Sequence, residues 1–226
     1  MATMLPTQAQ LTLINPTTLN GSFELPNTGT KIDPFNGSNV TNWSIISGGT
    51  YTDSGIQKTG SSPTPQDGSW VGFLMNNDSG IYNLVPSASY TMTAGDQYTL
   101  TMYAAISSTS GTAGPDQLTL DLFSSHDGTY NASYDVATSV NSMPTSLGKY
   151  VWQEYTLTYT AFPTDDGNQI GVYVANTFAD ATHNHYMDID DFTLTVTPAP
   201  EPSTYAMFFT GVLGLWGMRR FRRHLA

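Results

Sequence analysis

The side chains that could perform catalysis in this 226-residue chain are few and scattered. No serine stands in a Gly-x-Ser-x-Gly sequence, so no nucleophile elbow is indicated. The Asp165–Asp166 pair is followed by glycine and asparagine, which is typical of a turn rather than of a glycosidase carboxylate pair. The body contains only two glutamates, Glu24 and Glu154, and Glu154 alternates with threonines on the polar side of its segment. We therefore expect no catalytic residue and a protein that is not an enzyme.

Two histidines raise the question of a transition metal. His183 and His185 are two residues apart, so in a strand both side chains would project to the same face, as a zinc site could use. No third histidine lies close to them, and the chain has no cysteine. We expect a solvent-exposed loop pair instead of a metal site.

Aromatic side chains offer a different chemistry, because they stack on the apolar faces of sugar rings while polar side chains bind the hydroxyl groups. The chain has 13 tyrosines and 4 tryptophans. Trp152 and Tyr173 fall out of phase with the core residues of their own strands, so we predict that they are exposed and contact a ligand. The alternative is that these aromatics pack in the core or across strands, as most aromatics of a β-sandwich do.

The composition limits the class of function. Residues 1–200 hold 17 Asp and Glu against three Lys, a net charge of −14, whereas all four arginines lie beyond position 218. Such an acidic body repels nucleic acids and anionic lipid headgroups, so we expect no nucleic-acid partner. The absence of cysteine excludes a disulfide framework and thiol chemistry. Much Thr, Ser, Asn, Gly and Tyr with little Lys and Glu is typical of an extracellular β-protein.

The body before Pro198 alternates apolar and polar residues with a period of two, which indicates half-buried antiparallel strands. It shows no convincing apolar stripe of period 3.6. We predict an all-β fold, an antiparallel two-sheet β-sandwich of the jelly-roll type formed by one domain, 10–197. The segment 48–68, rich in Ser, Thr, Gly and Pro, is predicted to be a long surface loop. The expected strands cover 11–14, 22–25, 43–46, 70–75, 81–85, 97–106, 118–122, 151–161, 170–174 and 192–196.

Both ends of this body carry short motifs. Residues 20–26 read Asn-Gly-Ser-Phe-Glu-Leu-Pro, and residues 189–194 read Ile-Asp-Asp-Phe-Thr-Leu. Between them, residues 67–71 place an Asp-Gly turn before Ser-Trp-Val. These motifs resemble the galactose-binding-like jelly rolls, which include several carbohydrate-binding modules. The resemblance implies a fold in which the first and last strands lie together, and it does not specify a ligand.

The same resemblance implies a structural calcium ion, because acidic groups near the paired terminal strands often hold one in that family. Carried over to this sequence, the candidate ligands are Glu24 and one of Asp190 or Asp191. Calcium takes six to eight oxygen ligands, so carboxylates with loop carbonyls are suitable. Asp190 shares the phase of Phe192 and Leu194, so we expect it to point inward, where a carboxylate needs a cation or hydrogen-bond donors. The alternative is that these aspartates accept backbone N–H bonds at a strand end.

The last part of the chain has three segments: a proline-rich linker (198–204), an apolar segment (205–218) and a basic tail (219–226). Pro200, Glu201 and Pro202, the apolar run Tyr205–Met218 and the arginines together resemble the PEP-CTERM sorting signal. The resemblance implies recognition by a membrane-embedded exosortase, cleavage near the motif, and release or attachment at the cell surface. The apolar run is expected to be a transmembrane helix that anchors the precursor, with the basic residues on the cytoplasmic side. An ordinary tail anchor is the alternative. The basic residues are Arg219, Arg220, Arg222 and Arg223.

The N-terminal residues 1–9 have neither a basic region nor an apolar core of a signal peptide. Since the tail implies export, we expect a truncated or mis-assigned start, with an export signal upstream. The sequence as a whole predicts an exported, non-catalytic protein of the cell surface or exopolysaccharide matrix that acts by adhesion or by binding a polysaccharide. Two alternatives remain open: a purely structural matrix protein without a specific ligand, and a carbohydrate-active enzyme whose carboxylates are not recognised.

Overall fold

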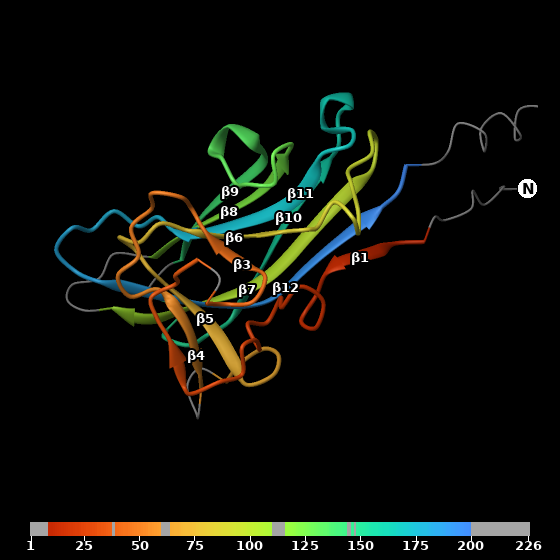
Figure 1. The fold of residues 1–226 in the computed structure, drawn as a ribbon. Coiled ribbons are helices and arrows are strands. Elements are labelled where there is room, and N and C mark those ends of the chain that lie inside the picture. Colours follow the sequence, from red (N-terminus) through yellow and green to blue (C-terminus); the bar gives the residue numbers. More distant parts are fainter. Residues whose placement is uncertain are drawn as a thin grey trace, which may run out of the picture.

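The computed structural model describes residues 9–37, 39–59, 64–109, 116–143, 146 and 148–199. Two antiparallel β-sheets lie face to face (Figure 1), and short 3-10 turns, η1 (Ala132–Tyr134) and η3 (Pro163–Asp165), flank the second sheet. Sheet A has the order β10 (Gln153–Thr160), β7 (Gln97–Thr109), β12 (His185–Thr197), β5 (Trp70–Met75), β4 (Gly55–Lys58) and β2 (Lys31–Ile32), and β1 (Leu11–Ile14) also pairs with β12. Sheet B has the order β3 (Trp43–Ile45), β6 (Ile81–Leu84), β11 (Gln169–Asn176), β8 (Asp116–Ser125) and β9 (Asp135–Met143).

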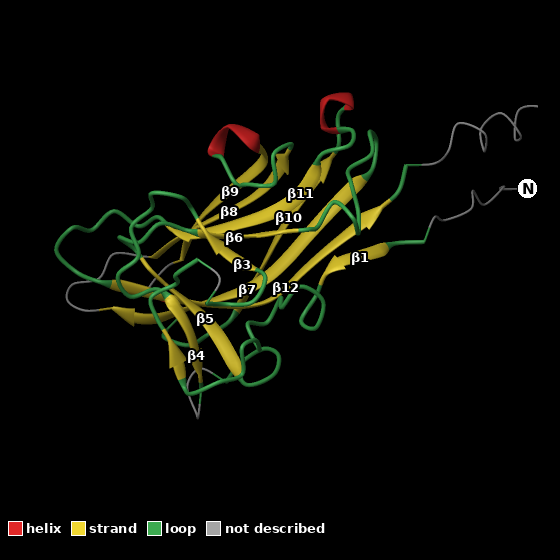
Figure 2. Cartoon of the chain, in the orientation of Figure 1, coloured by secondary structure: helices red, strands yellow, loops and turns green. Residues whose placement is uncertain are grey.

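The apolar half of each alternating pattern forms the core between the sheets. In β7 the buried residues Leu100 and Met102 face this core, and in β8 Leu118 and Leu120 face it from the other sheet. This is the aligned packing of two sheets whose inner faces interdigitate. The prediction of an all-β, antiparallel two-sheet sandwich is therefore confirmed, and strands dominate the described chain (Figure 2).

Most strands lie at the predicted positions, but β2 was not predicted, and three further features differ from the prediction. The predicted strand 22–25 is irregular, because Phe23 has φ +59° and Gly21 lies so close to the chain that a Cβ atom there would meet the Phe192 carbonyl oxygen at 2.4 Å. The predicted surface loop 48–68 contains β4, which pairs with both β5 and β2. Strand β9 was not predicted, because its residues 135–143 are mostly polar and half-exposed.

An aromatic cluster joins the beginning of the body to its end. The rings of Phe23 and Trp43 stack with centroids 4.7 Å apart, and both meet Phe192 edge-on, at 5.9 and 4.9 Å. The Trp43 indole N–H donates to the Asn20 carbonyl at 2.9 Å, so the buried polar atom is satisfied. The first and last strands, β1 and β12, pair as the sequence resemblance implied.

The structure describes no helix that is both long and apolar enough to cross a membrane. The predicted transmembrane segment, Tyr205–Met218, lies outside the described residues. So do the sorting motif, Pro200 to Pro202, and the basic tail with its arginines.

Candidate ligand-binding site

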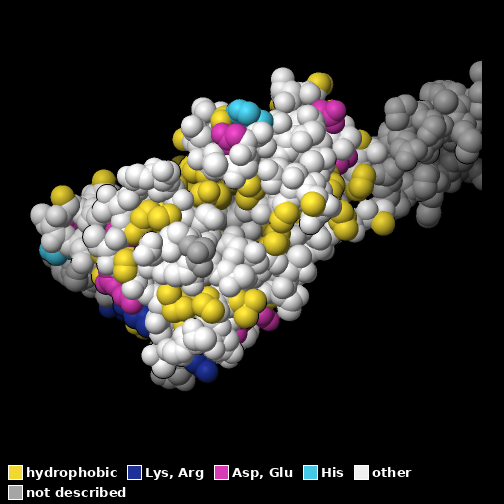
Figure 3. Space-filling model, viewed as in Figure 1, with side chains coloured by type: hydrophobic (Ala, Val, Ile, Leu, Met, Phe, Trp, Pro, Cys, Tyr) yellow, Lys and Arg dark blue, Asp and Glu magenta, His cyan; other side chains and the backbone are white. Residues whose placement is uncertain are grey.

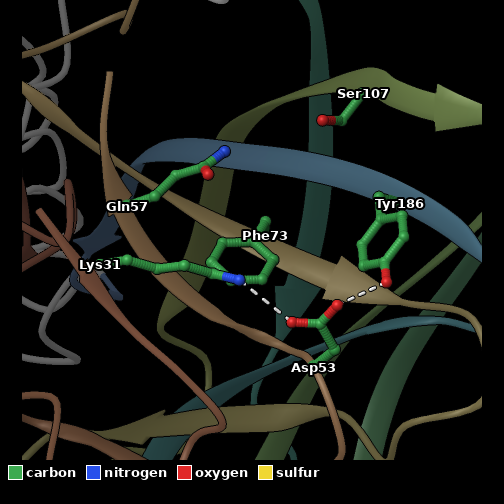
Figure 4. A pocket seen from close by; sticks show the side chains of 6 residues that line it. All are labelled: Lys31, Asp53, Gln57, Phe73, Ser107 and Tyr186. Carbon is green, nitrogen blue, oxygen red and sulfur yellow. Dashed lines mark hydrogen bonds and ion pairs between the residues drawn. The ribbon is translucent and has the colours of Figure 1, made fainter. Parts of the chain in front are cut away.

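A cavity of about 180 Å³ opens on the outer face of sheet A, away from the core (Figure 4). Its lining combines side chains from β2, β4, β5, β7 and β12 with one from the segment before β4. The pairing of β5 with β12 shows which side chains lie on this outer face. Phe73 on β5 pairs with Asp188 on β12, and both residues alternate with core residues. The lining residues are Lys31, Asp53, Gln57, Phe73, Ser107 and Tyr186.

Backbone contacts fix the position of Asp53. The carboxylate of Asp78 accepts from the Thr52 and Asp53 N–H groups, at 2.8 and 3.0 Å, and the Ser54 hydroxyl accepts from the Met75 N–H at 2.9 Å. The segment before β4 is therefore bound to β5 and to the turn that follows it. This binding holds the Asp53 carboxylate at the mouth of the cavity.

A chain of polar contacts crosses the cavity. The Lys31 ammonium lies 2.7 Å from Asp33 and 3.1 Å from Asp53, and the Tyr186 hydroxyl donates to the other oxygen of Asp53 at 2.5 Å. Burial and the bond to Asp53 raise the pKa of Tyr186 to about 12. Burial acts to raise the pKa of Asp53, but the bonds from Tyr186 and Lys31 outweigh it and hold the pKa below its usual range. The cation of Lys31 is therefore already balanced by carboxylates.

Lys31 also limits what the aromatic ring of the cavity can contact. Its ammonium lies 4.9 Å from the Phe73 ring centroid, a cation–π distance. Phe73 itself is buried. The ring therefore forms an apolar floor rather than an open stacking platform, and the polar groups around it supply the directional contacts.

Asp188 is a carboxyl group with unusual surroundings on the same sheet face. It is fully buried, and neither of its oxygens has a hydrogen-bond partner within bonding geometry. Burial raises the pKa of Asp188 to about 7, with the nearby Ser107 hydroxyl opposing the shift and the Asp116 charge adding to it. A carboxyl with this pKa is protonated in a large fraction of molecules near neutral pH, so it can donate a proton.

Basic side chains are scarce on the surface around the cavity. On the face drawn in Figure 3, the basic atoms gather at the lower edge, in the region of β4, and acidic groups lie close to them. The described body carries the lysines Lys31, Lys58 and Lys149 against many carboxylates. A neutral ligand therefore fits the site better than an anion.

The structure places the predicted calcium ligands beneath one loop. The Glu24 carboxylate accepts from the Ser69 and Trp70 N–H groups, both at 2.7 Å. One oxygen of Asp190 accepts from the Gln66 and Asp67 N–H groups, at 2.8 and 3.1 Å. Both carboxylates therefore hold the segment 66–70, which leads into β5.

The inward orientation predicted for Asp190 is wrong, for a reason that lies in the backbone. A β-bulge between Asp190 and Thr193 shifts the register of β12, with Asp191 at φ +52°. Asp190 therefore shares the outer face with Asp188, not the core face of Phe192. It is fully buried because the segment 66–67 covers it.

The calcium ion that the resemblance implied stays a prediction, and the contacts of these carboxylates show what would compete with it. Backbone N–H groups donate to Oε1 of Glu24 and to Oδ2 of Asp190, so these two oxygens already have donors. Asp191 takes no part in their contacts apart from its own N–H, which donates to Asp190 at 2.8 Å. Burial raises the pKa of Asp190 to about 8, opposed by the N–H groups. No group of three metal-ligating side chains occurs in the part of the chain that the structure describes.

The two histidines meet at one carboxylate, not in solvent. His183 Nδ1 and His185 Nε2 lie 3.0 and 3.1 Å from the same oxygen of Asp180. His185 is fully buried at the start of β12, so the expectation of an exposed loop pair is wrong for this residue. Hydrogen bonds from Thr182, with those from both histidines, hold the pKa of Asp180 far below its usual range.

The two predicted aromatic contacts are engaged with the protein itself. The Trp152 indole N–H donates to the Thr64 carbonyl at 2.8 Å. Tyr173 stacks on Tyr130 with a centroid distance of 4.4 Å and an interplanar angle of 4°. Neither residue lines the cavity.

The residues of the cavity were missed by sequence reasoning. Its lining comes from strands that are remote in sequence, and β2 and β4 lay in segments without strand patterns. One signal was present: Asp188 alternates with Met187 and Ile189, which places a carboxyl between two apolar residues of one strand. The alternation places Asp188 on the face opposite Met187 and Ile189, but it predicts neither the burial of this carboxyl nor its partner strands.

Fold and site together define a class, a two-sheet β-sandwich with a small polar cavity on the outer face of one sheet. The sequence profile of the HpiC1-like family, described as HpiC1 cyclase, matches residues 15–195, and the chain belongs to this family. The profile of the PEP-CTERM protein-sorting motif matches residues 198–223. That motif indicates export and sorting to the cell surface, and it implies processing by an exosortase. A search of curated proteins gives no match.

Solved structures with the same fold include cyclases and a carbohydrate-binding domain. A Stig cyclase, Fisc, from Fischerella sp. TAU in complex with (3Z)-3-(1-methyl-2-pyrrolidinylidene)-3H-indole has a TM-score of 0.59 at 16% identity, covering 85% of this chain and 100% of that one. A cyclase from the same organism in complex with 4-(1H-indol-3-yl)butan-2-one has a TM-score of 0.59 at 17% identity, covering 83% and 100%. The CBM22-1 xylan-binding domain of Paenibacillus barcinonensis Xyn10C has a TM-score of 0.50 at 14% identity, covering 86% and 100%. At these identities the likeness establishes the fold alone.

Proposed function

We propose that this exported protein acts at the cell surface or in the exopolysaccharide matrix by binding one sugar ring in the cavity of sheet A, without converting it. The observation that carries this proposal is the cavity itself, with converging polar side chains around one apolar floor. Its volume of about 180 Å³ is close to the ~150 Å³ of an engineered cavity that holds benzene. The site therefore suits one ring, for example the end of a glycan, rather than an extended chain.

The chemistry of the lining supports a neutral polyol. The amide of Gln57 and the hydroxyl of Ser107 can each donate and accept, as sugar hydroxyls require. The Asp53 carboxylate can accept a further hydroxyl bond, and the buried Phe73 ring gives the cavity an apolar floor. The xylan-binding domain named above has the same fold, which is consistent with this use of the fold.

The proposal is tested by titrating the full-length protein with neutral monosaccharides and observing ligand signals by saturation-transfer NMR. Binding is expected to be weak and to be lost in Gln57→Ala. Gln153→Ala, which changes the same residue type on β10, is the matched control and should bind like the parent protein. Equal binding by both variants would place the ligand elsewhere, and no binding of any neutral sugar would reject the proposal.

A second candidate function is acid-catalysed ring closure of a small unsaturated substrate. Asp188 favours it, because a buried carboxyl with no hydrogen-bond partner and a pKa of about 7 is suited to protonate a substrate. Membership of a family described as a cyclase, and neighbours bound to indole compounds, point in the same direction. The two functions separate in Asp188→Asn: turnover of an unsaturated indole substrate would disappear, whereas sugar binding would remain.

A further inference from the structure

The chain leaves the sandwich at a point that hydrogen bonds fix. Strand β12 ends at Thr197, and two residues later the Ala199 N–H donates to Oδ1 of Asp96 at 2.8 Å. Asp96 is buried, and its other carboxylate oxygen accepts from the Tyr90 hydroxyl at 2.5 Å. A Cβ atom on Gly95 would lie 3.0 Å from the Ala199 side chain, so the chain passes closely over this turn. The body therefore binds the chain up to the residue directly before the sorting motif.

The exposed ring of Phe162 lies beside this exit. The backbone of Ala161 bonds to the same turn: its N–H donates to the Asp96 carbonyl, and its carbonyl accepts from the Gly95 N–H, both at 2.9 Å. Phe162 follows directly and is 64% exposed, the largest fraction among the large hydrophobic side chains that the structure describes. An exposed phenyl ring next to the exit is placed to meet the surface that the chain enters.

A short turn holds this ring in place. The Phe162 N–H donates to Oδ2 of Asp165 at 2.8 Å, and the Tyr159 hydroxyl donates to the same oxygen at 2.5 Å. Pro163 begins the 3-10 turn η3 and restricts the backbone directly after the ring. Little further backbone freedom is therefore lost when the ring makes a contact, and this favours binding.

The charges near the exit indicate which kind of surface the ring can meet. The buried carboxyl groups of Asp96 and Asp165 have the donors given above. Asp166 is exposed, and its Oδ1 accepts from the Ala94 N–H at 3.4 Å. An exposed carboxylate is repelled by anionic headgroups but carries no such penalty beside zwitterionic ones. This end of the body therefore suits an apolar contact with neutral lipid.

The length of the chain beyond Ala199 limits how far the body can stand from a membrane. Tyr205, where the apolar run begins, is six positions further on, and six residues span at most about 22 Å when fully extended. The headgroup layer takes up about 5–8 Å of that distance. With the apolar run in the bilayer, the exit and the Phe162 ring beside it therefore lie close to the headgroups.

We propose that the Phe162 ring inserts into the surface of the membrane that holds the chain's own C-terminal segment, so that the body rests on neutral lipid at the end where the chain leaves it. The proposal rests on the predicted transmembrane segment Tyr205–Met218 and is independent of the sugar-binding cavity. Transfer of apolar area from water into the interfacial layer stabilises the contact. Such a contact orients the body and keeps the sorting motif at the membrane surface, where a membrane-embedded protease acts.

The absence of cysteine allows a test with one introduced label. The full-length protein with Thr164→Cys, labelled with bimane, is incorporated into phosphatidylcholine nanodiscs that contain lipids with a nitroxide headgroup. Thr164 is exposed in η3, two residues after Phe162, so quenching of the label measures contact of this turn with lipid. Ala181→Cys labels the exposed loop between β11 and β12, at the opposite end of the sandwich (Figure 1), and should be quenched less.

Phe162→Ser in the Thr164→Cys protein tests the ring itself. Burial of about half a phenyl side chain corresponds to about a tenfold change in the ratio of molecules in contact with lipid to molecules free of it, so quenching should fall accordingly. Val140→Ser is the matched control, because Val140 is a 56% exposed apolar residue on β9, and it should leave quenching unchanged.

Three results would overturn the proposal. One is quenching at position 164 that Phe162→Ser leaves unchanged, which would mean that the short tether alone brings the turn near the lipid. Another is an equal loss of quenching in Val140→Ser. The third is a protein that does not co-elute with the nanodiscs, which would contradict the predicted anchor and leave the sugar titrations of the cavity unaffected.

Discussion

At the scale of single residues, Glu24 shows how one carboxylate can anchor a loop. It accepts from two successive N–H groups, those of Ser69 and Trp70, directly before β5 begins. A Cβ atom on Gly68 would lie 2.2 Å from the same carboxylate, so only glycine leaves room for it. Glycine at position 68 therefore allows the Glu24 carboxylate to reach the N–H groups of Ser69 and Trp70.

Removing this anchor should weaken the protein locally. Glu24→Ala leaves two N–H groups without their acceptor, and hydrogen bonds to a charged group contribute roughly 1.5–3 kcal/mol each in buried settings. Because the Ser69 end is exposed, we expect a total loss of about 1–3 kcal/mol in the free energy of unfolding, measured with urea. Glu24→Gln keeps one acceptor oxygen and should lose less. An unchanged free energy of unfolding in Glu24→Ala would show that the N–H groups of the loop find other acceptors.

The same geometry gives a prediction about metals. Since N–H groups satisfy Glu24 and Asp190, chelation by EDTA should leave the melting temperature unchanged. Thermal unfolding with and without chelator, after dialysis against calcium, measures this. A melting temperature that falls by several degrees would support the calcium ion that the sequence resemblance implied.

Trp43 is packed within the aromatic cluster that joins the beginning of the body to its end. It is 1% exposed, sits between the rings of Phe23 and Phe192, and donates its indole N–H to Asn20. Trp43→Ala should cost about 3–5 kcal/mol of unfolding free energy, because it creates a large cavity. Trp43→Phe keeps the ring and should cost less. Urea unfolding compares the two, and equal losses would point to the hydrogen bond to Asn20 as the main contribution.

At the scale of elements, the bulge in β12 decides which side chains reach the outer face. Asp191 takes the left-handed conformation, at φ +52°, and shifts every later residue by one position. Asp tolerates this conformation, whereas a β-branched residue pays roughly 1–2 kcal/mol for it. We expect Asp191→Val to lose about that much stability. Asp191→Gly should lose little, and Thr193→Val, in extended backbone, is the control for the new side chain.

Strands with a clear period of two could be predicted from the sequence, because alternation reports directly on which side is buried. Leu11–Ile14 and Trp70–Met75 have the predicted bounds, and the core of β7 follows the predicted alternation. The orientation of Asp190 could not be predicted, since a bulge changes the phase without leaving a pattern of its own. The short strands β2 and β4 are defined by their partners, not by their own composition.

The cavity was beyond sequence reasoning for a related reason. Its lining side chains meet only because β12 lies between β7 and β5, with β4 and β2 beyond them. That order joins residues 31 and 186, which no local pattern connects. Aromatic residues were predicted to bind ligand from their phase, yet Tyr173 is covered by Tyr130, a residue of a loop.

At the scale of the whole molecule, buried carboxyls act on stability in one direction. Burial raises the pKa of Asp116 to about 6, of Asp135 and Asp188 to about 7, and of Asp190 to about 8. An acid with a raised pKa in the folded state binds its proton more tightly than in the unfolded chain. It therefore costs stability as the pH rises from the ordinary aspartate value to the raised value.

The carboxylates with a lowered pKa, Asp53, Asp127 and Asp180, have the opposite effect, but in a different pH range. Hydrogen bonds from Thr129 lower the pKa of Asp127 to about 2, and those from Thr182 and the two histidines lower that of Asp180 further. Their stabilisation is present above the ordinary aspartate pKa and is lost only as the pH falls below it. Between pH 5 and 8 they contribute a nearly constant amount to the free energy of unfolding. The carboxyls with raised pKa values therefore determine how stability changes with pH in this range.

We therefore expect the melting temperature to be higher at pH 5 than at pH 8. The acidic charge of the body acts in the same direction, because its self-repulsion grows as the carboxyls ionise. Thermal unfolding at several pH values measures the slope, and repeating it in high salt separates the two causes, since screening weakens surface repulsion but not buried desolvation. Asp188→Asn, which cannot ionise, should flatten part of the slope that remains in salt. A melting temperature that rises from pH 5 to pH 8 would mean that the buried carboxyls find partners in solution that compensate for their burial.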